Sequence, residues 1–180
     1  YSLPDPKLQG RAPGELEFLD PDYDKLSSAE KVNIPLEMEE LSLDADQRLK
    51  TEQSFYSDSI SYMVHADSNG FLEGETKTIY SMGISMIAED IESTANGTSE
   101  STNVGRKQTD GWYSAVRFHR NLTPSKEIVE KACQRTLRKL GAVKPASQEV
   151  PVVFSSEMAQ SFLGKIASAL MGENLFRKQS

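Results

Sequence analysis

Two histidines and one cysteine are the side chains in this sequence best suited to bind a transition metal or to act as a nucleophile: His65, His119 and Cys133. A zinc site needs several ligands at recognisable spacing, and neither histidine has a neighbouring ligand in such a motif. Both are therefore predicted to be ordinary strand residues. Cys133 lies in an apolar helical stripe, which favours a core thiol over a nucleophile. The sequence predicts no catalytic, cofactor-binding or metal-binding residue in this chain.

Two further polar clusters favour solvated surfaces. The acidic residues from Glu37 to Asp46 would bind a cation only if their carboxylates converged, whereas helical spacing makes them a solvated face. Asn96-Gly97-Thr98 has the spacing of a glycosylation acceptor, but no secretory signal accompanies it. Neither a phosphate loop nor a Gly-x-Ser-x-Gly elbow is present in the sequence.

The elements that position these residues begin with residues 1–26, which hold half of the eight prolines and are predicted to be an extended connector. Ser27 and Ser28, with Glu30 inside the first turn, predict a helix that continues to Leu43. Pro35 is expected to delay the start of this helix.

An alternating pattern then predicts an antiparallel meander. The segment from Thr51 to Ala66 is predicted to be a half-buried strand, Asp67-Ser68-Asn69-Gly70 a hairpin turn, and Phe71 to Ala88 the returning strand. Trp112 to His119 would close the sheet. Between the returning strand and Trp112, the segment from Asp90 to Asp110 has almost no large apolar residue, which predicts a mobile loop. This loop is either a substrate flap or a plain solvated insertion.

The C-terminal third predicts two helices separated by a strand. Thr123-Pro124 caps a helix whose apolar stripe ends at Gly141. Val150 to Phe154 is predicted to be a short strand, and Ser155-Ser156 to begin a second amphipathic helix. The fold class expected from all these elements is α+β or α/β, an antiparallel meander with flanking helices. The stripe of the first helix comprises Ile128, Val129, Ala132, Cys133, Thr136, Leu137 and Leu140.

Composition excludes several classes of protein. The 180 residues are 37% hydrophobic and 26% charged, with a net charge of −7, which argues for globular domains and against broad nucleic-acid binding. No apolar run reaches the roughly 20 residues that span a membrane. A single cysteine favours a reducing compartment and therefore the cytoplasm. Because the chain begins without Met or a signal sequence and ends without a stop signal for its last helix, it is expected to be a fragment.

Several segments together resemble the PmbA/TldE half of the TldD/PmbA family, whose members were described as modulators of DNA gyrase and are understood as parts of a cytoplasmic protease. The most specific block begins at Pro151 and ends in Arg177-Lys178-Gln179-Ser180. This block also contains Pro151-Val152-Val153-Phe154, Leu163-Gly164, Ala169-Leu170 and Gly172, and the other matching stretches are Leu3-Pro4-Asp5-Pro6, Asp67-Ser68-Asn69-Gly70-Phe71 and Thr136-Leu137-Arg138-Lys139-Leu140-Gly141-Ala142.

The resemblance implies a domain organisation and a missing metal site. Residues 27–145 would form the family's central α/β region, and residues 146–180 the first strand and helix of a large β-rich C-terminal domain. In TldD-type subunits the helix after the Pro-Val-Val strand carries His-Glu-x-x-x-His, which holds a metal and prepares a water for peptide hydrolysis. The corresponding window here is Gly164-Lys165-Ile166-Ala167-Ser168-Ala169. The resemblance therefore implies that this PmbA/TldE-type subunit does not bind that metal, and that the fragment is inactive alone.

The resemblance also implies partners. A TldD-like subunit would supply the metal, and the assembly would admit unfolded peptides in the cytoplasm for peptide maturation or antitoxin degradation; a homodimer is the other assembly expected. The alternative function is an independent peptide-binding or regulatory protein without protease function. Catalysis by this chain through ligands beyond Ser180 is the third and weakest reading.

Overall fold

The computed structural model describes residues 16–43, 45–89 and 106–178. The chain divides into two compact units, Tyr1–Ala142 and Val143–Ser180. The division expected from the sequence, after residue 145, lies close to this boundary. The functional extents assigned to residues 1–26, 27–145 and 146–180 stay predictions.

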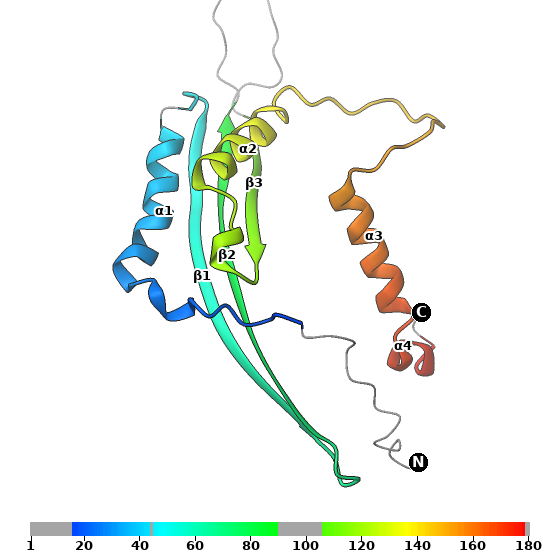
Figure 1. Ribbon diagram of the computed structural model, residues 1–180. Coiled ribbons are helices and arrows are strands. Elements are labelled where there is room, and N and C mark those ends of the chain that lie inside the picture. The colour runs from blue at the N-terminus through cyan, green and yellow to red at the C-terminus, as the bar shows by residue number, and fades with distance from the viewer. Residues whose placement is uncertain (1–15, 44, 90–105, 179–180) are drawn as a thin grey trace, which may run out of the picture. The chain divides into compact units, whose positions relative to one another are not determined.

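The first unit is built on a three-stranded antiparallel sheet with strand order β1-β2-β3 (Figure 1). Its strands are β1 (Leu49–Ala66), β2 (Leu72–Glu89) and β3 (Lys107–Val116). Each strand pairs with its neighbour in sequence, Leu49 opposite Ala88 and Tyr80 opposite Val116. The predicted fold class, an antiparallel meander with flanking helices, is confirmed.

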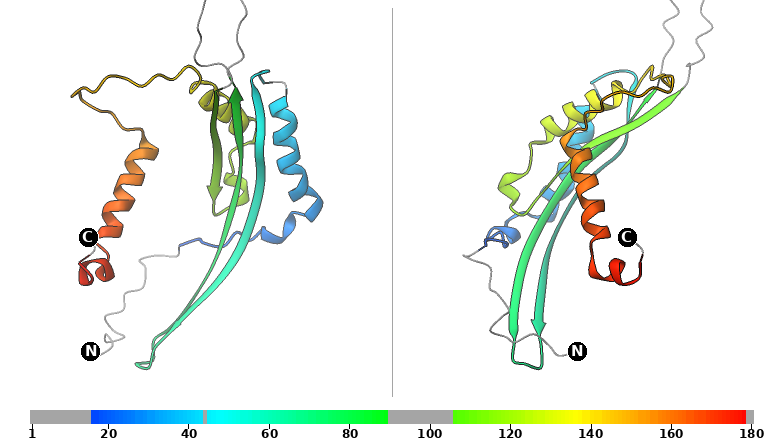
Figure 2. Two further views of the ribbon diagram at one scale, coloured as in Figure 1. Left: turned by 180° about the vertical axis from the view of Figure 1, so that it is seen from behind. Right: turned by 90° about the vertical axis from the view of Figure 1, so that its right-hand side faces the viewer.

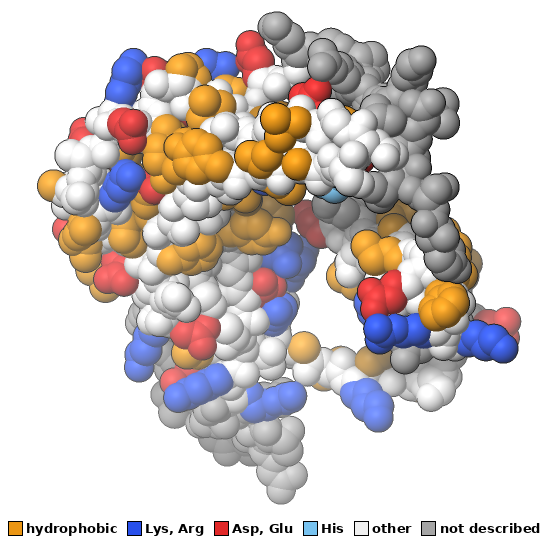
Figure 3. All heavy atoms as spheres, turned by 90° about the horizontal axis from the view of Figure 1, so that it is seen from below, with side chains coloured by type: hydrophobic (Ala, Val, Ile, Leu, Met, Phe, Trp, Pro, Cys, Tyr) orange, Lys and Arg blue, Asp and Glu red, His pale blue; other side chains and the backbone are white. Residues whose placement is uncertain are grey.

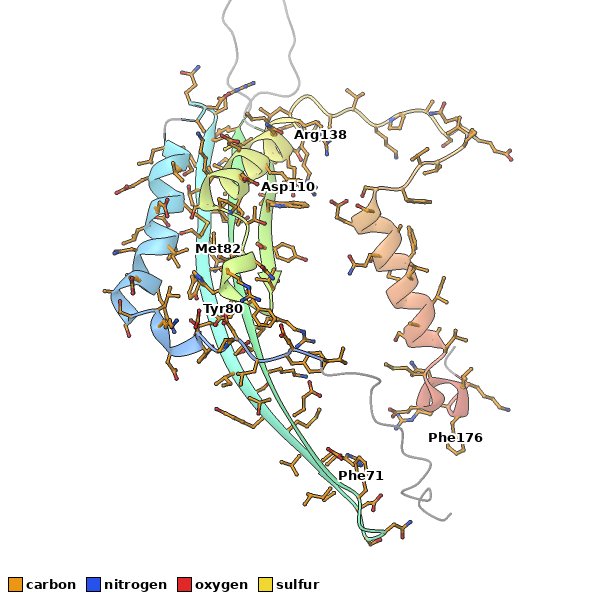
Figure 4. The ribbon with its side chains drawn as sticks, viewed as in Figure 1. Phe71, Tyr80, Met82, Asp110, Arg138 and Phe176 are labelled. Atoms are coloured by element: carbon orange, nitrogen blue, oxygen red, sulfur yellow. The ribbon has the colours of Figure 1, made fainter. Side chains whose placement is uncertain are left out.

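Two helices cover one face of this sheet, α1 (Ser28–Leu43) and α2 (Ser125–Leu137), as Figure 2 shows from the side. Short 3-10 turns at Tyr23–Lys25 and His119–Asn121 precede them. The predicted apolar faces of β2 and α2 meet in the core between the layers, where Tyr80 and Met82 lie (Figure 4). The buried members of these faces are Tyr80, Met82, Ile84, Met86, Ala88, Ile128, Val129, Ala132, Cys133 and Thr136.

Helix α1 begins at Ser28 and runs through Pro35, so the expectation that Pro35 delays its start is wrong. A reciprocal capping box explains the early start. The Ser27 backbone N–H donates to Glu30 Oε2 over 2.8 Å, and the Glu30 N–H donates to Ser27 Oγ over 3.3 Å. These bonds satisfy N–H groups that lack helical partners, and they fix the first turn before Pro35 is reached.

The end of the β1–β2 hairpin projects beyond the rest of the sheet (Figure 1). The β2–β3 pair nearest to the hairpin turn is Tyr80 with Val116. We call the part of the hairpin beyond it, from residue 60 to residue 78, the arm. Tyr62 and Met63 point to opposite faces of the arm and are 73% and 54% exposed. The prediction of a half-buried strand is therefore wrong for this part of β1, because no helix among the described residues covers it.

The predicted turn at the tip of the arm is confirmed. The Asp67 N–H donates to the Phe71 carbonyl over 3.0 Å, and Asp67 Oδ1 accepts from the backbone N–H groups of Asn69 and Phe71. Gly70 alone adopts the left-handed region, at φ +89°. The sequence signal that places this turn is therefore an Asp that bonds its own loop together with a glycine that accepts positive φ.

Strand β3 differs from its predicted bounds at both ends. It begins at Lys107, so the predicted loop cannot extend to Asp110, which pairs with Met86. It ends at Val116, so His119 lies in a 3-10 turn and not in a strand. The first difference arises because pairing with β2 orders polar residues that have no apolar signal. Residues 90–105, the rest of the predicted mobile loop, lie outside the described residues.

The second unit contains α3 (Ser156–Ala169) and α4 (Gly172–Phe176). Ser155 caps α3 as predicted, accepting a hydrogen bond from the Met158 N–H. The predicted strand from Val150 to Phe154 is wrong, since these residues form no ladder with any described strand. An apolar run becomes a strand only where a second strand pairs with it. No described helix is long and apolar enough to cross a bilayer.

Replacing Gly111 by Ala should lower the free energy of unfolding by about 1–3 kcal/mol, as overpacking of a closed site does. A Cβ at this position would lie 2.5 Å from the Ile84 carbonyl oxygen and 3.1 Å from Ser85 Cα, and backbone atoms cannot move aside easily. Chemical denaturation followed by circular dichroism measures the change. Gly74→Ala is the matched control, since its Cβ would meet no atom closer than 3.8 Å. Equal stability of the two variants would contradict the described register.

Candidate functional site

The structure places the three residues with metal-binding or nucleophilic side chains on separate elements. His65 lies in β1 with its ring against Phe71, at 5.6 Å between centroids. His119 lies beside the Tyr80 ring at 5.5 Å. Cys133 is buried in α2 with Sγ 3.5 Å from the Met86 sulfur, and burial raises the pKa of its thiol. The environment of Cys133 is that of a core thiol.

The window from Gly164 to Ala169 lies on the exposed helix α3. Gly164 and Ala169 carry no ligand atom, and Lys165 places a positive charge where a metal and its carboxylate base would be needed. Within residues 16–43, 45–89 and 106–178, no three His, Cys, Asp or Glu side chains gather in a group that could hold a metal ion. The residues present at this window do not fit a metal of the His-Glu-x-x-x-His type.

A groove lies between α1 and β1 in the first unit and has a volume of about 600 Å³. We call it the α1–β1 groove. Figure 3 shows hydrophobic side chains reaching the surface on the α1 side of this unit, with charged side chains between them. The groove is lined by Lys31, Val32, Pro35, Leu36 and Glu39 from α1 and by Ser54, Tyr56, Ser57 and Asp58 from β1.

An ion pair lies at one end of the α1–β1 groove. Lys31 Nζ is 2.7 Å from Asp58 Oδ2, and the Tyr23 hydroxyl donates to Asp58 Oδ1 over 3.2 Å. Burial acts to raise the pKa of Asp58, but the hydrogen bond from Lys31, hydrogen bonds from tyrosine hydroxyls and the charge of Lys31 together hold the pKa below the ordinary value. Asp58 is therefore ionised at neutral pH and compensates the charge of Lys31.

Tyr56 and Tyr80 lie beside this ion pair, on the same sheet face as Asp58. Burial raises the pKa of both hydroxyls well above the ordinary value, and nearby carboxylates raise it further, Asp58 for Tyr56 and Asp20 for Tyr80. Both tyrosines are therefore neutral at physiological pH. The paired carboxylate of Asp58 and the two protonated tyrosines therefore supply neither a free base nor a nucleophile.

Asp20 is the anchor that ties the segment before α1 to the sheet. Its Oδ2 accepts the His119 N–H over 2.8 Å, its Oδ1 accepts the Asp22 N–H over 3.0 Å, and its own N–H donates to Thr78 Oγ1 over 2.9 Å. The sequence assigned this residue to an extended connector and gave no role to Asp58 or Tyr56. The strand alternation that places Tyr56 and Asp58 on one face is the signal that could have paired them.

The comparison with protein families decides the relationship. The family described as "PmbA/TldA metallopeptidase central domain" matches residues 21–140, two thirds of the chain. The chain belongs to the PmbA/TldD family. This family relationship confirms the resemblance stated from the sequence, and the match contains α1, the whole sheet and α2.

Curated PmbA relatives extend the similarity along the entire chain. It is 28% identical over 187 aligned residues to the Metalloprotease PmbA of Escherichia coli O157:H7, with all of this chain covered. It is 29% identical over 179 residues to the Metalloprotease PmbA homolog of Buchnera aphidicola from Acyrthosiphon pisum, with 99% covered. The chain spans 38% and 37% of the lengths of these relatives.

Two solved structures share the fold. A protein of Bacteroides thetaiotaomicron described as a modulator of DNA gyrase superposes with a TM-score of 0.64 at 27% identity, covering 80% of this chain and 30% of that one. A Thermotoga maritima protein of the same description gives a TM-score of 0.58 at 20% identity, covering 77% and 29%. The second likeness shows the fold alone.

Proposed function

We propose that this chain is the central part of a non-catalytic PmbA/TldE-type subunit, which acts with a TldD-like partner as a cytoplasmic metalloprotease on unfolded peptides. The observation that carries the proposal is the window on α3, where Gly164, Lys165 and Ala169 stand at the positions that the resemblance assigns to the metal ligands and base of TldD-type subunits. The relatives named Metalloprotease PmbA support the protease context. In this proposal the partner supplies the metal, and this subunit helps to form a chamber that admits unfolded peptides.

An independent peptide-binding protein is the second candidate function. The α1–β1 groove favours it, because the groove is open and partly apolar. Such a protein would bind peptides without a TldD-like partner and would leave them intact. Peptide maturation and antitoxin degradation are the processes that the first function would serve.

The full-length protein that contains this chain should cleave no unstructured peptide by itself and should do so after mixing with a TldD-like protein. Elemental analysis of the separated subunits should then find the zinc or iron in the partner. A chelator should abolish the activity of the mixture. The matched control is the partner alone at the same concentration.

Two outcomes would contradict the proposal. Chelator-insensitive cleavage by the unmixed full-length protein would show that this subunit is itself catalytic. Failure to co-purify with a TldD-like protein, with no gain of activity on mixing, would favour the independent peptide-binding protein.

A further inference from the structure

The α1 side of the α1–β1 groove has an apolar surface formed by Val32 and Leu36, which we call the ledge. Val32 and Leu36 are four residues apart, so they lie on the same face of α1, and they are 60% and 51% exposed. Helix residues at such positions are normally polar unless something covers them. Met38, by contrast, points into the core and is fully buried. The helix therefore has two apolar faces, and only one of them is used by the fold.

The β1 side of the groove is the edge of the sheet. The strand order places β1 outermost, so one side of its backbone pairs with β2 and the other pairs with no strand in the described ranges. Edge strands are usually protected against further pairing by Lys, Pro or a bulge. The register shift between Thr51 and Gln53 is such a bulge, but the six residues from Gln53 to Asp58 contain neither Lys nor Pro. This stretch can accept another strand.

The charge of the groove lining limits which segments can bind there. Helix α1 carries four glutamates and one lysine, and that lysine is engaged by Asp58. Glu39, which accepts a hydrogen bond from Ser54 across the groove, leaves the lining acidic. A second copy of this chain paired through β1 would bring two acidic helices together. An extended segment with apolar and basic side chains complements both the ledge and the charge.

We propose that the α1–β1 groove binds an extended polypeptide segment as a fourth strand, paired through its main chain with the outer side of Gln53–Asp58. Side chains of an added strand alternate between the two faces. Those facing α1 are apolar where they meet Val32 and Leu36, and basic where they meet Glu39. Main-chain bonds supply affinity and the alternate side chains supply selectivity, as in other strand-addition sites. The proposal requires no metal-bearing partner.

The probe is a fluorescein-labelled peptide in which two valines and a lysine share one face, with serine and threonine at the alternate positions. Fluorescence anisotropy should show saturable binding to the 180-residue chain. Hydrogen exchange should slow at the backbone amides of residues 53–58 when the peptide is bound. The same peptide N-methylated at alternate residues should bind at least about tenfold more weakly, because it cannot complete the ladder. A peptide with glutamate in place of lysine should also bind more weakly.

Exposed substitutions with matched controls locate the site. Leu36→Lys removes apolar surface from the ledge and should weaken binding about tenfold, whereas Leu43→Lys, at a 77% exposed position of the same helix, should not. Glu39→Gln should weaken binding about threefold, and Glu40→Gln, which lies outside the groove lining, should leave it unchanged. Circular dichroism confirms that each variant keeps its fold.

Equal binding of the methylated peptide, equal weakening by Leu36→Lys and Leu43→Lys, or no binding at all would each overturn the proposal. So would self-association through this edge, seen as a dimer in sedimentation that Leu36→Lys dissociates. Because these measurements use the chain alone, they are independent of the proteolysis experiment with a TldD-like partner. Peptide binding without gained proteolysis would reject the proposed function and keep this site.

Discussion

Replacing Met86 by Ala should lower the free energy of unfolding by about 2–5 kcal/mol, the range for removing a large aliphatic side chain from a closed core. Met86 is fully buried on β2, and its sulfur contacts Cys133 Sγ of α2 at 3.5 Å. The lost side chain leaves a cavity where sheet and helix meet. Urea unfolding of the chain, followed by circular dichroism, measures this change.

Met63→Ala is the matched control, since it makes the same chemical change on the arm, where Met63 is more than half exposed. Its expected effect is within about 0.5 kcal/mol of zero. A large loss at Met63, or a small one at Met86, would mean that the arm is covered or that the core is assembled differently from the description above.

Asp20→Ala should lower the free energy of unfolding by about 3 kcal/mol at neutral pH, because hydrogen bonds to a buried ionised group are stronger than neutral ones. The substitution leaves the N–H groups of Asp22 and His119 without their carboxylate partner. Burial acts to raise the pKa of Asp20, but the hydrogen bonds from His119 and Asp22 hold it below its ordinary value of 3.8. Guanidinium unfolding at neutral pH measures the loss.

The sign of the pH dependence follows from that lowered pKa. A carboxyl group whose pKa is lower in the folded state stabilises the fold above its unfolded pKa, and this contribution disappears as the pH falls through the folded pKa. The difference between wild type and Asp20→Ala should therefore be full at neutral pH and shrink below about pH 4. Asp24→Ala, an exposed neighbour, is the control. A difference independent of pH would show that Asp20 acts without its charge.

Much of the first unit can be predicted from the sequence because periodicity records burial directly. The alternation from Tyr80 to Ala88 and the helical stripe from Ile128 to Thr136 each mark one apolar face, and these faces form the core. The Asp67–Gly70 turn is equally clear because its residues bond within the loop itself. Patterns of this kind involve residues that are close together in the sequence, so they can be recognised without the tertiary structure.

Other features could not be predicted from the sequence, because they depend on contacts between distant segments of the chain. The alternation in β1 continues past Ile60, although no described helix covers the arm, so pattern alone cannot tell a buried face from an exposed one. Asp20 looks like a connector residue until Thr78 and His119 lie beside it. The α1–β1 groove exists only because an exposed helix face lies along an unpaired strand edge.

The position of the hairpin turn also constrains the order in which the fold assembles. Strand pairing in a hairpin usually begins at the turn and proceeds away from it. Here the turn lies at the tip of the arm, where few apolar contacts stabilise the first pairs. The pairs that reach the core, such as Leu49 with Ala88, join the two ends of the hairpin. Bringing these two ends together restricts the chain between them and lowers its entropy, and burial of the core offsets this cost only afterwards. We therefore expect the sheet to fold at a rate typical of long-range contacts, more slowly than strands that pair with their sequence neighbours would suggest.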